Sequence, residues 1–527
     1  MGHRWIFLSI VLALVALAVG PARTSGSNIV RCPDTLEVVR DRAESLVRSG
    51  DVPSLAIAVS FHGEIIWMDA FGTADREGNT PATVDTSYAL ASITKPFTAT
   101  ALMQLVEEGR LSLGDPASLY LGGAQMISRV GDVPDVTVAS LASHTSGLPL
   151  HSQAYYVDLD EPCRPAPFDE TLRCYGNLTT DPGERYQYSN LGYGVLGYIL
   201  ERLTGQSYAE LMAERVFDPL ELRHTFVGPP GPDQDNVAAK HDSDGHRVPP
   251  ATSDCSAACA IYSSVSDLIR FAEVHLRGGT SANSGLLSAS SLLRMQVPSP
   301  GTQPTRSWEC AGGGYGIGWF VGFLSDGLKI IDHSGGACGI GTSLILVPEE
   351  QLAVAVLSNT HGPWADEIAI SVVSALIPHR LANVCVAADN PAPVAEAVTD
   401  VDPRLEGTWV GAIETCERNI PLRLRVDDEG QAWIRISGWT EQQLEQVSYM
   451  EGSPILMNAG GGRYLRGAMP GGLLTSAVLR GCPCRTWIEL RLIEDRLQGA
   501  VICLSQRDFW TGPLSFWAEL MRKESGE

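Results

Sequence analysis

The distribution of hydrophobic residues predicts a strand pair followed by helices in the first half of the chain. Residues 50–72 hold two apolar runs on either side of His62–Gly63, which indicates two strands joined by a tight turn. Apolar residues then recur at helical spacing over 92–109, 190–205 and 207–217, and glycines end the first two of these stretches. We therefore expect an antiparallel sheet that begins near residue 50 and a mainly helical middle region.

The second half of the chain has mainly strand-like patterns. Short apolar or alternating runs over 314–359 predict several strands of one antiparallel sheet, and a helix over 364–382 follows. Residues 386–403 carry three prolines and lack large apolar residues, which is the composition of a linker. From Leu405 onward, brief strand-like runs alternate with turns, so we expect a small β-barrel. This barrel either only stabilises the molecule or takes part in binding.

Composition and charge narrow the class of protein. Hydrophobic residues make up 44% of the 527 residues and charged residues 19%, as in ordinary globular proteins, and the length predicts two or three domains. The 38 Lys and Arg residues against 61 Asp and Glu residues give a formal net charge of -23. This charge opposes binding to nucleic acid, and it also repels anionic membranes and strongly anionic substrates.

Residues 1–26 have the layout of a secretory signal peptide. A basic start is followed by an apolar run from Trp5 to Val19 and then by small residues. An uncleaved membrane anchor is the alternative, but the run is shorter than the roughly 20 residues that cross a bilayer. No later segment is apolar enough to span, so we expect a secreted or periplasmic protein with no stable membrane span after signal removal.

Export also favours disulfides for the twelve cysteines of the chain. Cys163 and Cys174, in one Pro-rich stretch, are the most plausible local bridge. The pair Cys482–Cys484 would bridge to Cys416 or Cys503 rather than bind zinc, because no second matching pair of ligands follows.

Ser92 and Lys95 stand three residues apart at the entrance of the helix predicted over 92–109. Residues three apart in a first turn lie on one face, so the hydroxyl and the amine can come within hydrogen-bonding reach. A lysine buried under apolar neighbours can lose its proton and act as a base, and the helix N-terminus favours negative charge at the serine. Alone, Ser-x-x-Lys is weak evidence, because it often arises by chance.

Tyr188 and Asn190 form a second candidate element, directly before the helix predicted over 190–205. A buried phenol beside a lysine can relay the proton of the serine, and the amide of Asn190 can donate to a substrate carbonyl and hold the lysine. The structural alternative is a core tyrosine followed by an asparagine that caps the helix.

The third candidate element is His333 with the following Gly335 and Gly336, in a strand context. Glycine lets a substrate lie against the strand, and the backbone N–H of Gly336 can join that of Ser92 in holding an oxyanion. His333 is a candidate for orienting a leaving group or a carboxylate, and its structural alternative is a polar residue at the end of a strand.

Several segments, in one order, resemble the class C β-lactamase and penicillin-binding-protein-like serine hydrolase family. The matching segments are ASITKPFTATALMQLVEEGRLSL, VTVASLASHTSGLP, PGERYQYSNLGYGVLGYILERLTGQSYAELM, and DHSGG with TSLILVPEEQLAVAVLSN, between residues of about 35 and 382. The resemblance implies an α/β fold, a β-lactamase/transpeptidase-like sandwich of an antiparallel sheet flanked by helices, plus a helical subdomain. It implies a hydrolase domain over 27–385, and 404–527 resembles the lipocalin-like barrel of some members.

The same resemblance assigns roles to the motif residues. Ser92 would be the nucleophile, and Lys95 with Tyr188 the base system. The residues that would bind substrate are Asn190, His333, Gly335 and Gly336. No metal or other cofactor is implied.

Two positions depart from the family pattern. His333-Ser334-Gly335 stands where β-lactamases usually present Lys-Thr-Gly, a version similar to that of esterase- and peptidase-like members. It weakens the cationic site for a β-lactam carboxylate, so we expect esters or small peptides to be preferred. Cys259–Ala260 stands where relatives commonly show two glycines, which suggests a disulfide that stiffens this loop.

We therefore expect hydrolysis of an ester, amide, peptide or β-lactam bond through an acyl-enzyme on Ser92, with a small-molecule or peptide acyl substrate as partner. The alternative is a catalytically weak penicillin-binding or ligand-sensing protein that uses the C-terminal barrel.

The segment His144–Gly147 is interpreted as a structural turn. His241, Asp242 and His246 share a polar loop, but a metal site there would need further ligands. The oligomeric state is not predicted.

Overall fold

The computed structural model describes most of the chain between residues 30 and 523. The described ranges are 30–129, 136–156, 165–276, 285–302, 312–381, 402–415, 418–436, 441–453, 458–469, 484–493, 495–505 and 514–523. The predicted signal peptide, linker residues 386–401, Cys163, Cys416 and Cys482 lie outside them. The domain boundaries, the signal peptide and the bridges that involve these cysteines therefore stay predictions, although Cys174 is disulfide-bonded. Within the described ranges, no helix combines the length and the apolar character needed to cross a membrane.

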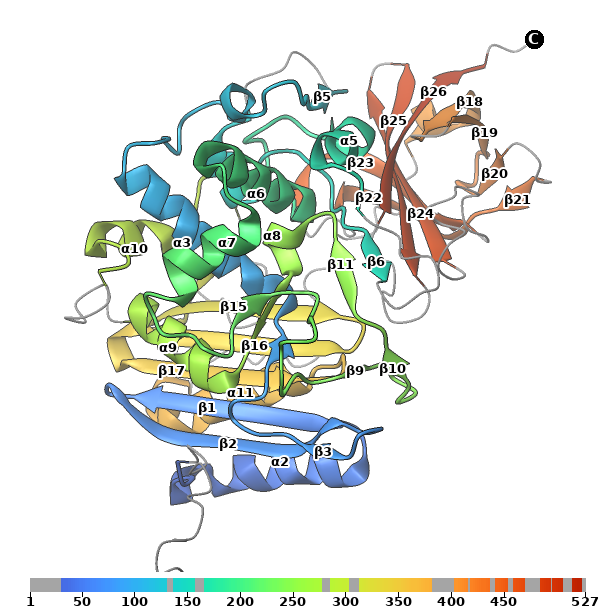
Figure 1. The fold of residues 1–527 in the computed structure, drawn as a ribbon. Coiled ribbons are helices and arrows are strands. Elements are labelled where there is room, and N and C mark those ends of the chain that lie inside the picture. The colour runs from blue at the N-terminus through green and yellow to red at the C-terminus, as the bar shows by residue number, and fades with distance from the viewer. Residues whose placement is uncertain are drawn as a thin grey trace, which may run out of the picture.

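Eight strands of the described chain form one antiparallel sheet, as the apolar runs predict (Figure 1). Along the sheet these are β13 (Gly313–Tyr315), β14 (Phe320–Phe323), β15 (Lys329–Ala337), β16 (Ile340–Val347), β17 (Leu352–Ser358), β1 (Ser54–Phe61), β2 (Glu64–Asp75) and β3 (Thr80–Pro81). β1 pairs with β17, with Ile57 opposite Val356. The first strands of the chain therefore complete a sheet whose other strands follow residue 312.

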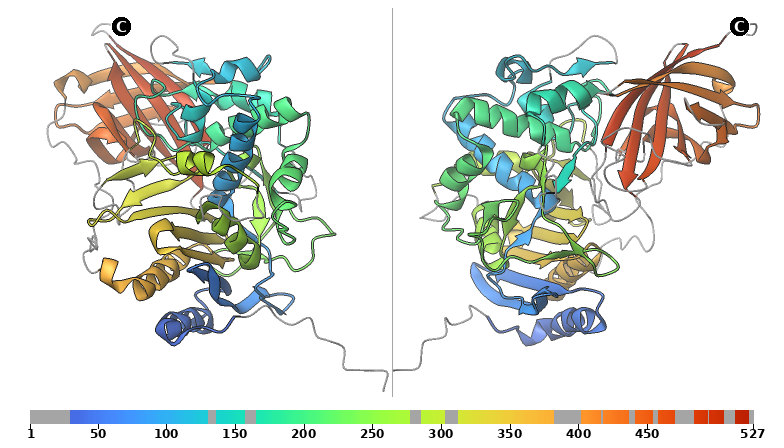
Figure 2. Two further views of the ribbon diagram at one scale, coloured as in Figure 1. Left: turned by 90° about the vertical axis from the view of Figure 1, so that its left-hand side faces the viewer. Right: turned by 45° about the vertical axis from the view of Figure 1, so that its right-hand side comes forward.

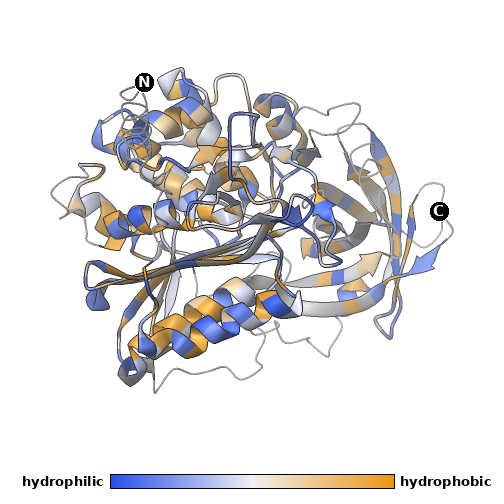
Figure 3. Ribbon diagram, turned by 60° about the horizontal axis from the view of Figure 1, so that its bottom comes forward, coloured by the Kyte–Doolittle hydropathy of each residue, from blue (hydrophilic) through white to orange (hydrophobic). Residues whose placement is uncertain are grey.

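Helices cover both faces of this sheet, which explains why β1 is apolar at nearly every position. Its larger side chains, at Leu55, Ile57 and Val59, pack in one core with α2 (Glu37–Ser49) and α11 (Trp364–Leu376). Among its alternate residues, Ala56 and Ala58 face a second core on the other side, where α9 (Val265–Leu276) lies on β1 and β17. Figure 3 shows the covering helices with hydrophobic residues on one side and hydrophilic residues on the other.

The middle of the chain is helical, as predicted, and lies on the α9 side of the sheet (Figure 1). Its other helices are α3 (Thr94–Glu107), α4 (Val138–Ala142), α5 (Phe168–Tyr175), α6 (Asn190–Thr204), α7 (Tyr208–Met212), α8 (Ser256–Cys259) and α10 (Ala289–Met295). The stretch predicted over 207–217 becomes α7 followed by a π-helical turn at Ala213–Phe217. The helix predicted over 364–382 is divided into α11 and α12 (Pro378–Leu381). These features confirm the β-lactamase-like α/β architecture.

Several short strands of the described chain pair in groups of two or three outside the large sheet. They include β4 (Tyr88–Ala89), β12 (Ile261–Ser263) and β8 (Phe226–Val227) in one group, β9 (Lys240–His241) with β10 (Arg247–Val248), β6 (Ala154–Tyr156) with β11 (Ala251–Ser253), and β5 (Ile127–Ser128) with β7 (Asn177–Leu178). Two of them matter for the site, because β4 leads directly to Ser92 and β9 carries Lys240.

Beyond residue 402, nine strands of the described residues form a second antiparallel sheet. In order these are β21 (Gln442–Gln443), β20 (Ala432–Ile436), β19 (Asn419–Val426), β18 (Gly407–Glu414), β26 (Leu514–Arg522), β25 (Arg496–Ser505), β24 (Cys484–Ile493), β23 (Asn458–Met469) and β22 (Glu445–Ser453). The two end strands, β21 and β22, are joined in the chain by Leu444 alone, so the sheet curls back toward itself (Figure 2). The sheet-rich C-terminal region is confirmed, and its likeness to a lipocalin stays a prediction.

The C-terminal sheet touches the helical region beside α5. The rings of Phe516 and Tyr175 lie 5.9 Å apart, and Glu414 forms an ion pair with Arg129. Arg491 approaches Glu184 at 3.8 Å. These contacts place the sheet against the helical region rather than against the eight-stranded sheet.

Candidate active site

Ser92 lies in a tight turn between β4 and α3. Residues Ala91–Ile93 form one turn of 3₁₀-helix, and Ala91 has a positive φ of 47°, a conformation that non-glycine residues rarely adopt. Such backbone geometry is kept only where the surroundings enforce it. A 3₁₀ turn that contains Ser92 thus precedes the expected helix, and Pro96 falls in the first turn of α3, where its missing N–H is tolerated.

The turn is held between two sheets by the backbone of Leu90. Its N–H donates to the carbonyl of Ile261 at 2.8 Å, and its carbonyl accepts from the Thr342 hydroxyl at 2.9 Å. A Cβ atom at Gly335 would collide with the Leu90 carbonyl oxygen. Gly335 therefore allows β15 to lie directly against the segment that carries Ser92.

The hydroxyl of Ser92 is within hydrogen-bonding distance of both predicted partners. The Nζ atom of Lys95 lies 3.1 Å from Ser92 Oγ, and the phenol oxygen of Tyr188 lies 2.8 Å from it. Asn190 Oδ1 accepts from Lys95 Nζ at 2.8 Å. The structure therefore brings together Ser92, Lys95, Tyr188 and Asn190.

Asn190 is free to hold Lys95 because a different residue caps its helix. The Ser189 hydroxyl accepts from the N–H of Gly192 at 2.9 Å and donates to the carbonyl of Pro149. Asn190 then begins α6 with its amide available to the lysine.

Lys95 is fully buried, and its amine has no carboxylate within ion-pair distance among the described residues. Nζ donates to the carbonyl of Ala258 at 3.1 Å and lies 4.7 Å from the centre of the Tyr188 ring. Burial lowers the pKa of Lys95 from its ordinary value of 10.5 to about 7. Near neutral pH this amine can therefore accept a proton.

His144, which the sequence suggests is structural, lies beside Tyr188. The two ring centres are 4.2 Å apart, and His144 Nδ1 accepts from the N–H of Ser189 at 3.1 Å. Burial, with Lys95 and His333 nearby, holds the pKa of His144 well below its ordinary value. A neutral ring that anchors the backbone after Tyr188 restricts the position of the phenol.

His333 is buried in the same aromatic cluster and has both ring nitrogens engaged. Its Nδ1 lies 2.8 Å from the carbonyl oxygen of Ser334, so Nδ1 carries the proton and Nε2 accepts from the Tyr315 hydroxyl at 3.0 Å. The ring of Tyr315 also lies 4.6 Å from that of His144. The structure thus places His333 behind the base system, joined to it by Tyr315, and not on the cavity wall.

A cavity of about 360 Å³ opens beside Ser92, within the range of small-ligand sites. Polar or ionisable residues on its wall include Ser92, Asn190, Lys240, Cys259, Cys338 and His361. Gly336 also lines it, and a Cβ there would approach His361 Cε1 to 3.1 Å. Of the predicted substrate-binding residues, Asn190 and Gly336 reach the cavity, whereas Gly335 packs against Leu90.

The disulfide expected at Cys259 is a wrong prediction, because Cys259 is a free thiol, as is Cys255. Cys255 and Cys259 bracket α8, where each sulfur contacts a backbone carbonyl instead. Cys259 Sγ lies 3.6 Å from the carbonyl oxygen of Cys255, and Cys255 Sγ lies 3.6 Å from that of His151.

Sequence reasoning missed Lys240 and His361 as cavity residues. Both belong to segments without a recognised motif, which are joined by a parallel bridge between His241 and Thr360 and by hydrogen bonds of Asn359. One signal was available for Lys240. The sequence contains only four lysines, at positions 95, 240, 329 and 523, against 34 arginines among the 38 basic residues.

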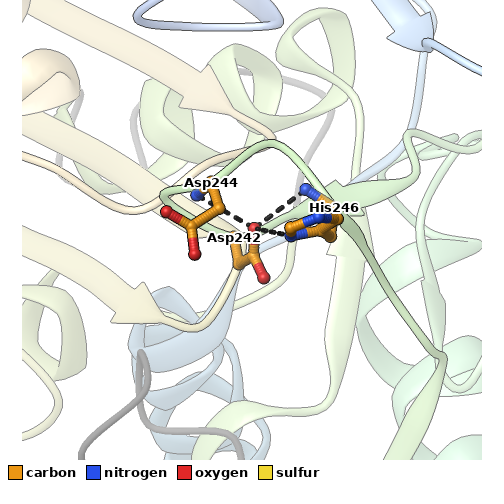
Figure 4. Close-up of side chains that lie close together, drawn as sticks. All are labelled: Asp242, Asp244 and His246. Carbon is orange, nitrogen blue, oxygen red and sulfur yellow. Dashed lines mark hydrogen bonds and ion pairs between the residues drawn. The ribbon is translucent and has the colours of Figure 1, made fainter.

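The polar loop after β9 brings Asp242, Asp244 and His246 within 4.8 Å of one another (Figure 4). Asp242 Oδ1 accepts from the backbone N–H of Asp244 at 3.0 Å and from that of His246 at 2.8 Å. This pattern is a carboxylate that closes a turn, and it accounts for the cluster without an ion.

Comparisons with known proteins agree with this geometry. Residues 39–375 match the family model described as Beta-lactamase. A beta-lactamase of Pseudomonas fluorescens is 26% identical over 373 residues, which cover 65% of this chain and 99% of the relative.

Two solved structures share the fold. The octameric penicillin-binding protein homologue from Pyrococcus abyssi is 23% identical, with a TM-score of 0.56 over 92% of this chain and 99% of that chain. EstCE1, a hydrolase with promiscuous acyltransferase activity, is 22% identical, with a TM-score of 0.54 over 64% of this chain and 98% of that chain. Since the family model spans more than half of the sequence and the fold agrees with it, this chain belongs to the Beta-lactamase family.

Proposed function

We propose that the chain is an exported serine hydrolase that cleaves an ester, amide or β-lactam bond through an acyl-enzyme on Ser92. The observation that carries this proposal is the meeting of an alcohol, an amine and a phenol. Ser92 Oγ lies 3.1 Å from Lys95 Nζ and 2.8 Å from Tyr188 Oη. Since a serine hydroxyl is too weak an acid to attack unaided, an adjacent proton acceptor is the feature that makes it a nucleophile.

In the proposed reaction, the proton of Ser92 passes to Lys95, directly or through Tyr188, while Oγ forms a bond to the acyl carbon. The resulting oxyanion is held by the backbone N–H groups of Ser92 and Gly336. The bond to the leaving group then breaks, and the leaving group takes the transferred proton. Water attacks the acyl carbon next, with the same base accepting its proton, and releases Ser92.

Among substrates, esters and small peptides are favoured over β-lactams. The third candidate element has His333 where β-lactamases usually have a lysine. Both ring nitrogens of His333 are engaged within the protein. Two relatives named above are a hydrolase and a beta-lactamase, which supports the reaction class but not a substrate. Export is proposed from the apolar N-terminal run alone.

The competing proposal is a ligand-sensing protein that binds through its C-terminal sheet. Among the described residues, the wall of the Ser92 cavity comes entirely from positions 89–361, and none comes from the C-terminal sheet. A pure binder also has no need of a nucleophile beside a base. Both observations favour the hydrolase.

The first test is covalent labelling with a fluorophosphonate probe. We expect a single adduct on Ser92 by mass spectrometry, and we expect Ser92→Ala to abolish both the adduct and the hydrolysis of 4-nitrophenyl acetate. Ser140→Ala, in the same helical region but away from the cavity, is the matched control and should label normally. Absence of an adduct from the folded wild-type protein would remove the proposal.

A further inference from the structure

Lys240 contributes a cation to the wall of the cavity that contains Ser92. It lies on β9, at a position that is distant in the sequence from the three candidate elements that carry Ser92, Tyr188 and His333. Its Cβ packs against Gly339, where an added Cβ atom would come within 2.5 Å of it. The strand and this close contact hold the lysine beside the end of β15, the strand that also carries Gly336.

The charge of Lys240 is unbalanced. The cavity wall contains no Asp or Glu among the described residues, and no ion pair to Lys240 occurs there. Burial lowers the pKa of Lys240 to about 8, so most molecules still carry the ammonium at pH 7. A partly buried cation without an anion costs free energy, and a substrate anion would offset that cost.

Lys240 also lies near the reacting groups. The charges of Lys95 and Lys240 both act on the thiol of Cys259, and Cys259 lines the same cavity as Ser92 and Lys240. Cys259 directly follows Ala258, whose carbonyl accepts from Lys95 Nζ at 3.1 Å. A substrate with its acyl carbon at Ser92 can therefore extend along this wall toward Lys240.

The choice of lysine is itself informative. In a chain with 34 arginines and four lysines, two of the lysines belong to this site. Lysine presents a compact point charge with three donors, which can bind one oxygen of a carboxylate, whereas arginine contacts both oxygens with its planar fork.

We propose that Lys240 binds a carboxylate carried by the acyl substrate and so selects anionic substrates. This inference rests on the proposed function, because it places the carboxylate in the cavity where Ser92 reacts. It gives the site a local preference opposite to that expected from the net charge of -23. It also supplies the cation that the third motif lacks.

The experiment compares two esters that differ in one charge, 4-nitrophenyl hemiglutarate and its methyl ester. We expect wild-type protein to favour the carboxylate, and Lys240→Gln to lower the ratio of the two kcat/KM values about 10- to 100-fold, as loss of one charge-assisted contact predicts. Lys240→Arg should recover most of the ratio. Lys329→Gln, which removes a lysine outside the cavity, is the matched control and should keep the ratio within about twofold.

Binding without turnover separates this inference from the proposed reaction. In the Ser92→Ala protein, calorimetry with glutaric acid mono-4-nitroanilide and its methyl ester should show about tenfold weaker binding of the acid after Lys240→Gln. Equal ratios in wild type and Lys240→Gln, in both assays, would overturn the role of Lys240. Failure of Ser92 to label, with the binding preference intact, would overturn only the reaction.

Discussion

At the scale of single residues, the protonation state of Lys95 decides whether Ser92 can react. The side chain is fully buried, its hydrogen-bond partners are neutral groups, and burial brings its pKa down to about 7. Below this pH the ammonium predominates and cannot accept the serine proton. Above it the neutral amine predominates and can do so, so acylation should gain rate as pH rises through 7.

We accordingly predict that kcat/KM for 4-nitrophenyl acetate rises up to about tenfold per pH unit below 7 and levels off above it. Lys95→Arg should remove this rise and lower the rate about 100- to 10,000-fold, because a guanidinium stays protonated. Stopped-flow rates between pH 5.5 and 8.5 measure both effects, with melting temperatures as a check on folding. A flat wild-type profile would assign the base to another group.

At the scale of elements, the site depends on how closely β15 approaches the turn that carries Ser92. Gly335 faces the Leu90 carbonyl with no space for a Cβ atom, and Thr342 on the neighbouring strand β16 bonds the same carbonyl at 2.9 Å. The glycines of the third motif thus do two different things. Gly335 positions the turn, and Gly336 leaves room in the cavity.

Gly335→Ala should therefore displace the turn or strain it. We predict a loss of about 1–3 kcal/mol in the free energy of unfolding, typical of overpacking, and a fall of about tenfold or more in the rate of fluorophosphonate labelling. Gly123→Ala is the control, because a Cβ at Gly123 meets nothing within 4 Å. Chemical denaturation and labelling kinetics are the measurements. Wild-type values for both would show that β15 can move to accommodate the added methyl group without loss of stability or reactivity.

At the scale of the whole molecule, the C-terminal sheet packs against the helical region, and none of its described residues lines the cavity. Phe516 is almost fully buried and meets Tyr175, whose ring stacks on His151 at 3.9 Å. His151 in turn precedes Ser152, which is on the cavity wall. The ion pairs nearby are partly exposed and contribute little, so we expect the buried aromatic contact to contribute more to the attachment than they do.

Phe516→Ala should thus lower stability by about 3–5 kcal/mol, as for other buried aromatic residues. We expect the labelling rate of Ser92 in the folded variant to stay within about threefold of wild type, because no described residue of the C-terminal sheet lines the cavity. Val410→Ala, on an exposed position of the same sheet, is the matched control. A large loss of labelling in folded Phe516→Ala would instead connect the sheet to the site.

The sequence by itself determined the local features of this protein. Strand alternation, helical spacing and the turn at His62–Gly63 are set by neighbours a few residues apart, and so is the meeting of Ser92 with Lys95 within one helical turn. The order of the motifs also indicated the family, because that order can be read along the chain without knowing how the segments pack. The sheet-rich region after residue 402 was also predictable from its alternating runs.

Only the tertiary structure decided which distant groups share the cavity. Tyr188 reaches Ser92 across 96 residues, whereas His333 turns toward Tyr315 and Cys259 remains a thiol. Lys240 enters through a two-residue strand with no motif around it. These outcomes follow from the packing of separate chain segments, because the direction of a buried side chain depends on neighbours that local periodicity does not specify.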